Sequence, residues 1–232
     1  MTFPAGLGVH TEALGWGAAF ADVDNDGYPD LLVVNGHVYP EVDAAKLGAT
    51  FKEPRFLYWN QGNGKFKDVS ASGGPGLTEP LSGRGLAVGD LWNDGRVDAV
   101  VNNLSEMPLL LVNEAANGNH WLGVKLVGTV SNRDGIGARV TVVGTKRRWV
   151  DEVRSGSTFS SSSDLRLHFG LGAETKVVEV DVRWPNGESE GFSINPSGKS
   201  GPINPSGKSG PINRVDCFVE LTEGKGKPLA VK

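Results

Sequence analysis

The sequence of 232 residues is poor in several features, and each shortage argues against a class of protein. It contains one cysteine, Cys217, so an intrachain disulfide is impossible and the redox compartment stays undecided. No apolar run reaches the roughly 18 residues that a membrane-spanning helix requires. Basic residues form no run and the formal net charge is −4, which argues against nucleic acid as a partner.

Signals of helices and of enzymes are also missing. No long stripe of apolar residues recurs every 3.6 residues, which argues against a helical fold. The Gly-x-Ser-x-Gly and His-Glu-x-x-His motifs do not occur, and the four histidines show no metal-ligand spacing. His37 is the best candidate among them for a catalytic or ligand group, although a plain surface residue is the more ordinary interpretation, whereas His168 is expected to be structural.

Glycine is abundant instead. The chain has 33 glycines and 13 prolines beside 38% hydrophobic residues, which is typical of a turn-rich all-β protein. The length predicts one or two domains with sizeable cores. The first residues lack the charged start and apolar core of a secretory signal peptide.

The most informative stretch is residues 22–30, Asp-Val-Asp-Asn-Asp-Gly-Tyr-Pro-Asp. Its carboxylates stand at positions 1, 3, 5 and 9 around a glycine at position 6, and they repel one another unless a cation gathers them. Ca²⁺ takes six to eight oxygen ligands in a flexible shell, and glycine permits the sharp turn that such a loop needs. The predicted ligands are the side chains of Asp22, Asp24, Asp26 and Asp30 and the backbone carbonyl of Tyr28.

This loop is not an EF-hand. An EF-hand requires a bidentate Glu at position 12 and a helix on either side, but position 12 here is Val33. The apolar run 31–34 after the loop and the Gly-rich segment 15–21 before it both predict strands. We therefore expect the loop to join two strands.

A second copy of the pattern begins 68 positions later, at residues 90–98. Here Trp92 stands at position 3, where an indole offers no oxygen ligand. The predicted ligands of this weaker site are the side chains of Asp90, Asp94 and Asp98 and the carbonyl of Arg96. For both loops the alternative is a structural turn in which carboxylates accept backbone N–H bonds, and this alternative fits the second loop better.

The two loops mark a repeat. Residues 56–69 between them predict a hairpin about an Asn-Gly turn, and residues 109–113 begin the equivalent strand after the second loop. A period of roughly 60–70 residues with about four strands is typical of propeller blades. Two blades cannot close a propeller, so we expect a C-terminal part of a longer protein, whose open edges invite association.

At this point the chain resembles a known family. The Gly-Trp-Gly triplet at 15–17, the loop at 22–30 and Tyr-Trp-Asn-Gln-Gly-Asn-Gly-Lys-Phe at 58–66 are similar to FG-GAP/VCBS repeats, the calcium-binding blades of integrin-type β-propellers. Residues 119–140, with 152–156, 165–172 and 182–187, resemble the ASPIC/UnbV domain of bacterial VCBS-repeat proteins and animal cartilage acidic proteins. The resemblance implies bound Ca²⁺ and an extracellular or periplasmic location.

The second half predicts a β-sandwich, because six alternating strands are joined by Gly-rich turns. We expect propeller blades over 1–117, the sandwich over 118–224 and a tail over 225–232. The predicted strands cover 121–127, 138–143, 148–153, 165–169, 177–184 and 216–221. Three arginines, Arg139, Arg154 and Arg166, could bind an anion but are expected to pair with Asp134, Glu152 and Asp164 at the sheet surface.

A nine-residue tandem occupies 194–211, where residues 194–202 recur letter for letter at 203–211. It contains Gly-Lys-Ser twice, but five residues separate the glycines where a phosphate-binding loop requires four. Its composition predicts a flexible, solvated loop.

Two classes of function remain. The first is a non-catalytic, calcium-binding interaction or adhesion module, secreted or surface-exposed, with a protein or a glycan as partner. The second is an enzyme or accessory protein of a biosynthetic pathway, suggested because some similar bacterial proteins are encoded among biosynthetic genes. We expect the first.

Overall fold

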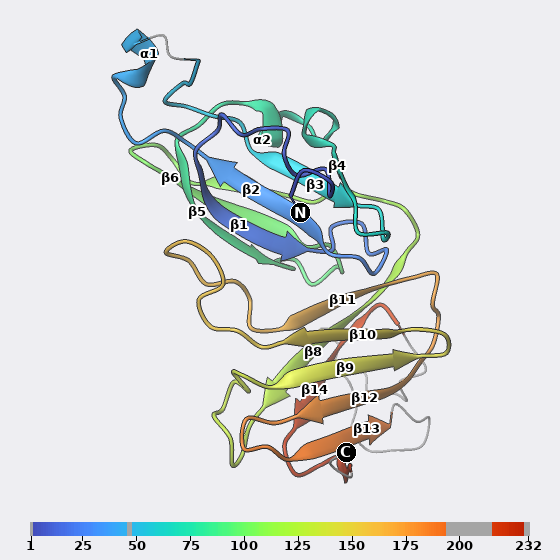
Figure 1. Ribbon diagram of the computed structural model, residues 1–232. Coiled ribbons are helices and arrows are strands. Elements are labelled where there is room, and N and C mark those ends of the chain that lie inside the picture. Colours follow the sequence, from blue (N-terminus) through green and yellow to red (C-terminus); the bar gives the residue numbers. More distant parts are fainter. Residues whose placement is uncertain (1, 46–47, 194–214, 230–232) are drawn as a thin grey trace.

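The computed structural model describes residues 2–45, 48–193 and 215–229 and is almost entirely β-structure (Figure 1). This confirms the all-β prediction. The helical pieces are short: α1 (Val42–Ala45), α2 (Pro75–Thr78) and a 3-10 turn at Ser70–Ser72. None of the helices in these residues is long and apolar enough to cross a membrane. The tandem at 194–211 lies outside the described residues.

The first sheet is an antiparallel meander in which each strand pairs with the next along the chain. Its strands are β1 (Gly15–Ala21), β2 (Asp30–Asn35), β3 (Phe56–Asn60) and β4 (Phe66–Asp68). The loop at 22–30 thus joins two strands, as expected, and β3 and β4 form the expected hairpin. The alternation of side chains along these strands leaves one face of the sheet apolar.

A second meander repeats this order of pairing. Its strands are β5 (Gly83–Gly89), β6 (Asp98–Asn103) and β7 (Leu109–Leu111). The two sheets share one apolar cluster, made of Ala19, Leu32, Val34, Leu77, Leu86, Ala99 and Val101. Because both sheets contribute to this cluster, they pack face to face, and the repeat in sequence is a repeat in structure. We call β1–β7 the N-terminal sheets.

The rest of the described chain forms a sandwich of two sheets, as expected. One sheet has the order β10-β9-β12-β13-β15 and the other β11-β8-β14, in which β14 runs parallel to β8. The strands are β8 (His120–Val127), β9 (Arg139–Gly144), β10 (Arg148–Glu152), β11 (Leu167–Gly172), β12 (Val177–Arg183), β13 (Ser189–Ser193), β14 (Cys217–Thr222) and β15 (Lys227–Pro228). One core lies between the sheets, and it includes Leu122, Val124, Val140, Val142, Val180, Val182, Trp184 and Val219.

Two details differ from the sequence-based expectations. Strands β13 and β15 were not among the six expected strands, and β15 falls in the expected tail at 225–232, where it pairs with β13. Arg166 pairs with Asp164 at 2.6 Å, as expected, but Arg154 pairs with Asp151 at 2.9 Å. The prediction for Arg154 was wrong because β10 ends at Glu152, so the alternation that would put Arg154 on the same face as Glu152 stops there. Arg139 lies opposite Glu152 in the β9–β10 register.

Candidate metal centre

The loop at 22–30 is a tight turn whose shape depends on two left-handed residues. Asn25 has φ 58° and Gly27 has φ 87°, a region that glycine enters without steric cost. Asp22 fastens the turn, because its Oδ1 accepts the N–H of Asp26 at 3.1 Å and its Oδ2 accepts that of Gly27 at 2.8 Å. The first carboxylate of the motif therefore lies inside the turn.

Two further carboxylates reach the same place from different parts of the hairpin. Asp30, at the start of β2, accepts the N–H of Val23 at 3.1 Å and that of Asn60 on β3 at 2.8 Å. Asp24, within the loop, accepts the indole N–H of Trp59 at 3.1 Å. These bonds fix the directions of both side chains.

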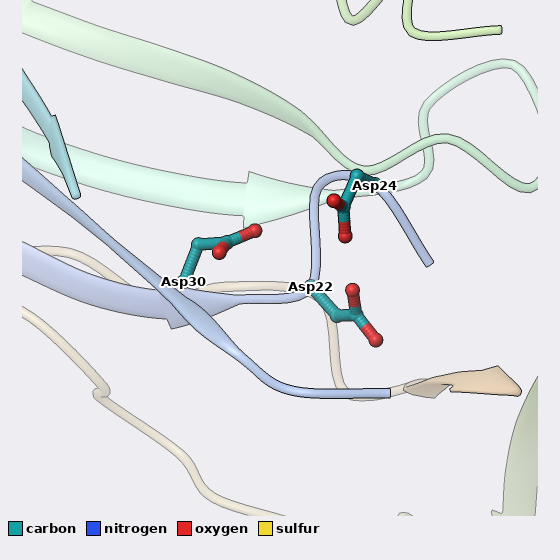
Figure 2. Close-up of side chains that lie close together, drawn as sticks. All are labelled: Asp22, Asp24 and Asp30. Carbon is teal, nitrogen blue, oxygen red and sulfur yellow. The ribbon is translucent and has the colours of Figure 1, made fainter. Parts of the chain in front are cut away.

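The carboxyl groups of Asp22, Asp24 and Asp30 gather around the turn (Figure 2). One oxygen from each lies within 4.8 Å of the others. Two ligands on opposite sides of a calcium ion, each at about 2.6 Å, stand about 5.2 Å apart, so this spacing fits three oxygens around one ion. The donor set consists of hard carboxylate oxygens, which suits Ca²⁺.

Burial makes these carboxyl groups costly to ionise without a cation. Asp22 is 5% exposed and Asp30 is 1% exposed. Burial, together with repulsion from the neighbouring aspartates, raises the pKa of Asp22 to about 8 and that of Asp30 to about 7. A bound dication would reverse this, since it stabilises the ionised form of each ligand.

Two of the predicted ligands lie differently. Asp26 is not a member of the close group, because its Oδ1 accepts the backbone N–H of Tyr28 at 2.8 Å. The Tyr28 ring lies under the guanidinium of Arg147, 3.9 Å from that group's central carbon. The ligand roles of the Asp26 side chain and the Tyr28 carbonyl remain predictions.

The second loop, residues 90–98, repeats the hydrogen bonds of the first. Asp90 accepts the N–H groups of Asp94 at 3.1 Å and Gly95 at 2.7 Å. Asp98 accepts those of Leu91 at 3.2 Å and Asn113 at 2.9 Å. The left-handed residues recur as well, with Asn93 at φ 56° and Gly95 at φ 86°. The two loops therefore share one backbone shape.

The second loop has no carboxylate at the position of Asp24. Trp92, at the position of Asp24, is 61% exposed, and Asp94 forms an ion pair with the side chain of Arg96. Within the described residues, the carboxylates of Asp90, Asp94 and Asp98 do not come together as a group like that of the first loop. The shape of the turn is thus maintained by hydrogen bonds from backbone N–H groups to aspartate side chains, and Asp24 is what distinguishes the first loop chemically.

One residue of the first loop was missed by the sequence reasoning. The side chain of Asn25 donates to the Gly95 carbonyl at 2.8 Å and therefore directs its Oδ1 to His168 Nε2, 2.7 Å away. His168 is thus a structural residue, and burial lowers its pKa to about 4. His37 instead interacts with the backbone N–H of Tyr39 at 3.2 Å.

The chain matches known families in the regions that carry these features. The FG-GAP repeat family matches residues 14–49, the FG-GAP-like repeat family residues 47–101, and the ASPIC and UnbV family residues 128–209. Cartilage acidic protein 1 of Mus musculus is 42% identical over 66 residues. That stretch covers 28% of this chain and 10% of the mouse protein.

Proposed function

Because the chain carries FG-GAP-type repeats and an ASPIC and UnbV domain, we propose that it is a calcium-binding, non-catalytic interaction module that works outside the cell. These families suggest an extracellular adhesion or interaction role and are generally non-catalytic. The observation that carries the calcium part is the group of three aspartates in the first loop.

The metal would be structural. Asp22, Asp24 and Asp30 would hold it, with the Asp26 side chain and the Tyr28 carbonyl completing the shell. Calcium supplies positive charge to carboxylates that burial otherwise disfavours, and so it stiffens the turn between β1 and β2. The second loop, which has Trp92 at the position of Asp24, would stay metal-free.

The two N-terminal sheets would serve as consecutive blades of a β-propeller. In both sheets each strand pairs with the next along the chain, and the same acidic turn joins the first two strands. The apolar faces of the two sheets share one core. In this arrangement the acidic turns lie at the same end of neighbouring blades. A protein or a glycan outside the cell would be the partner.

Calcium titration by calorimetry tests the site. We expect one ion per chain in the wild type, and loss of this binding in Asp24→Ala, because one of the three gathered carboxylates is removed. Asp94→Ala in the second loop is the matched control and should bind like the wild type. Equal binding by Asp24→Ala and the wild type would refute the site.

The interaction part requires a separate measurement. A protein and glycan array, probed with the whole chain with and without chelator, should show binding that calcium strengthens. Turnover of a substrate, lost in His37→Ala, would instead support an enzyme.

A further inference from the structure

The sandwich contacts the backbone of the first metal loop directly. The carbonyl of Asn25 accepts the N–H of Gly172 at 2.8 Å, and its side chain accepts from His168 at 2.7 Å. Arg147, in the turn between β9 and β10, donates to the carbonyl of Gly27 and stacks on the ring of Tyr28. The loop is therefore bonded at successive positions by residues more than a hundred positions later in the chain.

Gly170 on β11 allows this close approach. A Cβ at this position would overlap the Oδ2 atom of Asp22 and would lie 2.6 Å from the Cα of Asn25. The three atoms nearest to such a Cβ all belong to the metal loop. Glycine is thus required here by the neighbouring loop rather than by the sandwich itself.

The connection between the two halves of the chain is fastened to the same loop. Asn119 donates its side-chain N–H to the carbonyl of Asp24 at 2.9 Å, and Asn117 donates to the same carbonyl. Asp24 is the ligand that distinguishes the first loop from the second. Its backbone is therefore fixed by residues that lead into β8.

Other contacts between the halves do not involve the first loop. Arg166 donates to the carbonyl of Asp90 at 2.9 Å, and the N–H of Asp164 bonds to the carbonyl of Val88 at 3.1 Å. A cavity of about 740 Å³ between the halves is lined by β1 and β10 and also by Asp22, Gly27 and Tyr28 of the first loop. The first loop is thus one of several points at which the sandwich is bonded to the N-terminal sheets.

We propose that the calcium site is a two-part site, in which the sandwich holds the first loop in its metal-binding shape and the metal in turn fastens the sandwich to the loop. This inference rests on the proposed calcium binding. Coupling free energies are reciprocal. If contact between the sandwich and the loop raises calcium affinity by some factor, bound calcium must strengthen that contact by the same factor. Gly170, His168 and Arg147 are positioning residues: Arg147 bonds to the loop backbone, His168 bonds to the side chain of Asn25, and Gly170 leaves room for the Asp22 carboxylate.

Gly170→Ala in the full chain tests the proposal. The substitution adds no charge and presses on the loop from the sandwich side, so we expect calcium affinity to fall about tenfold, a typical size for coupled sites. Val180→Ala is the control, because it removes two methyl groups from the sandwich core without touching the loop. It should lower the stability of the sandwich and leave calcium affinity unchanged.

The reciprocal effect is measured by hydrogen exchange. The amide of Gly172, which bonds to Asn25, should exchange about tenfold more slowly in calcium than in chelator, whereas the amide of Asp164 should not change. A wild type that binds no calcium would refute the proposed function. A wild type that binds calcium with the same affinity as Gly170→Ala, and with no change at Gly172, would refute the coupling alone.

Discussion

The second loop offers a test by gain of function. Trp92→Asp would place a carboxylate at the position of Asp24, in a turn whose remaining hydrogen bonds already match those of the first loop. The Trp92 side chain is 61% exposed, so its removal sacrifices little packing. We expect the variant to bind two calcium ions per chain and the wild type to bind one.

The new site should be weaker than the first, and the structure gives a measure of how much. Asp94 is paired with Arg96, and a metal must displace that guanidinium. An exposed ion pair is worth about 0–1 kcal/mol, so the pair weakens calcium binding by up to about fivefold. At a calcium concentration about 100 times the dissociation constant, the second ion would stabilise the fold by about 2.7 kcal/mol.

Calorimetric stoichiometry is the direct assay, and the calcium-dependent shift of the melting temperature supports it. Trp92→Ala removes the indole without adding a ligand and should bind one ion, like the wild type. A folded Trp92→Asp protein that still binds one ion in millimolar calcium would show that a matching backbone and three carboxylates do not make the site. The reasoning from the shape of the turn would then be wrong.

Three further predictions concern titration and a buried anion. Because the pKa values of Asp22 and Asp30 are raised to about 8 and about 7, protons compete with the metal, so calcium affinity should rise from pH 6 to pH 8, with proton release seen as calorimetric heats that depend on the buffer. An affinity that is constant over this range would contradict the argument. Burial lowers the pKa of His168 from 6.5 to about 4, so its share of stability is complete above pH 6.5 and is lost as the pH falls toward 4, with a slope of roughly 1.4 kcal/mol per pH unit in denaturant titrations. Because Asp22 and Asp30 titrate nearby with the opposite sign, the slope belongs to the difference in stability between the wild type and His168→Phe. Glu223, 4% exposed, accepts the N–H groups of Thr129, Val130 and Ser131, so Glu223→Gln should lower the free energy of unfolding by roughly 2–3 kcal/mol in urea, and a loss below the error of the fit would exclude a structural role for the charge.

Patterns that depend on nearby residues were predicted correctly from the sequence. The spacing of Asp22, Asp24 and Asp30 and the apolar runs on either side locate both the turn and the strands that it joins. The position of Trp92 singles out the second loop as different. Each of these signals lies within a stretch of about ten residues, and over that length hydrophobic periodicity and turn residues determine the local structure.

Features that depend on distant residues were missed. Asn25 occupies a motif position with no predicted ligand role, and its hydrogen-bond partners Gly95 and His168 are far away in sequence. The two-residue strand β15 carries no period of its own and exists because β13 offers an edge.

The pairing of β14 with β8 has a consequence for how the protein is made. Val219 and Leu221 on β14 fill the sandwich core, and β14 lies parallel to β8, from the start of the same domain. Such a pairing closes only after the intervening chain has left the ribosome, and long-range contacts of this kind form slowly. The N-terminal sheets, built from neighbouring strands, can fold during synthesis. The sandwich must wait, with one edge of β8 unpaired, and an unpaired strand edge is the kind of surface through which chains associate.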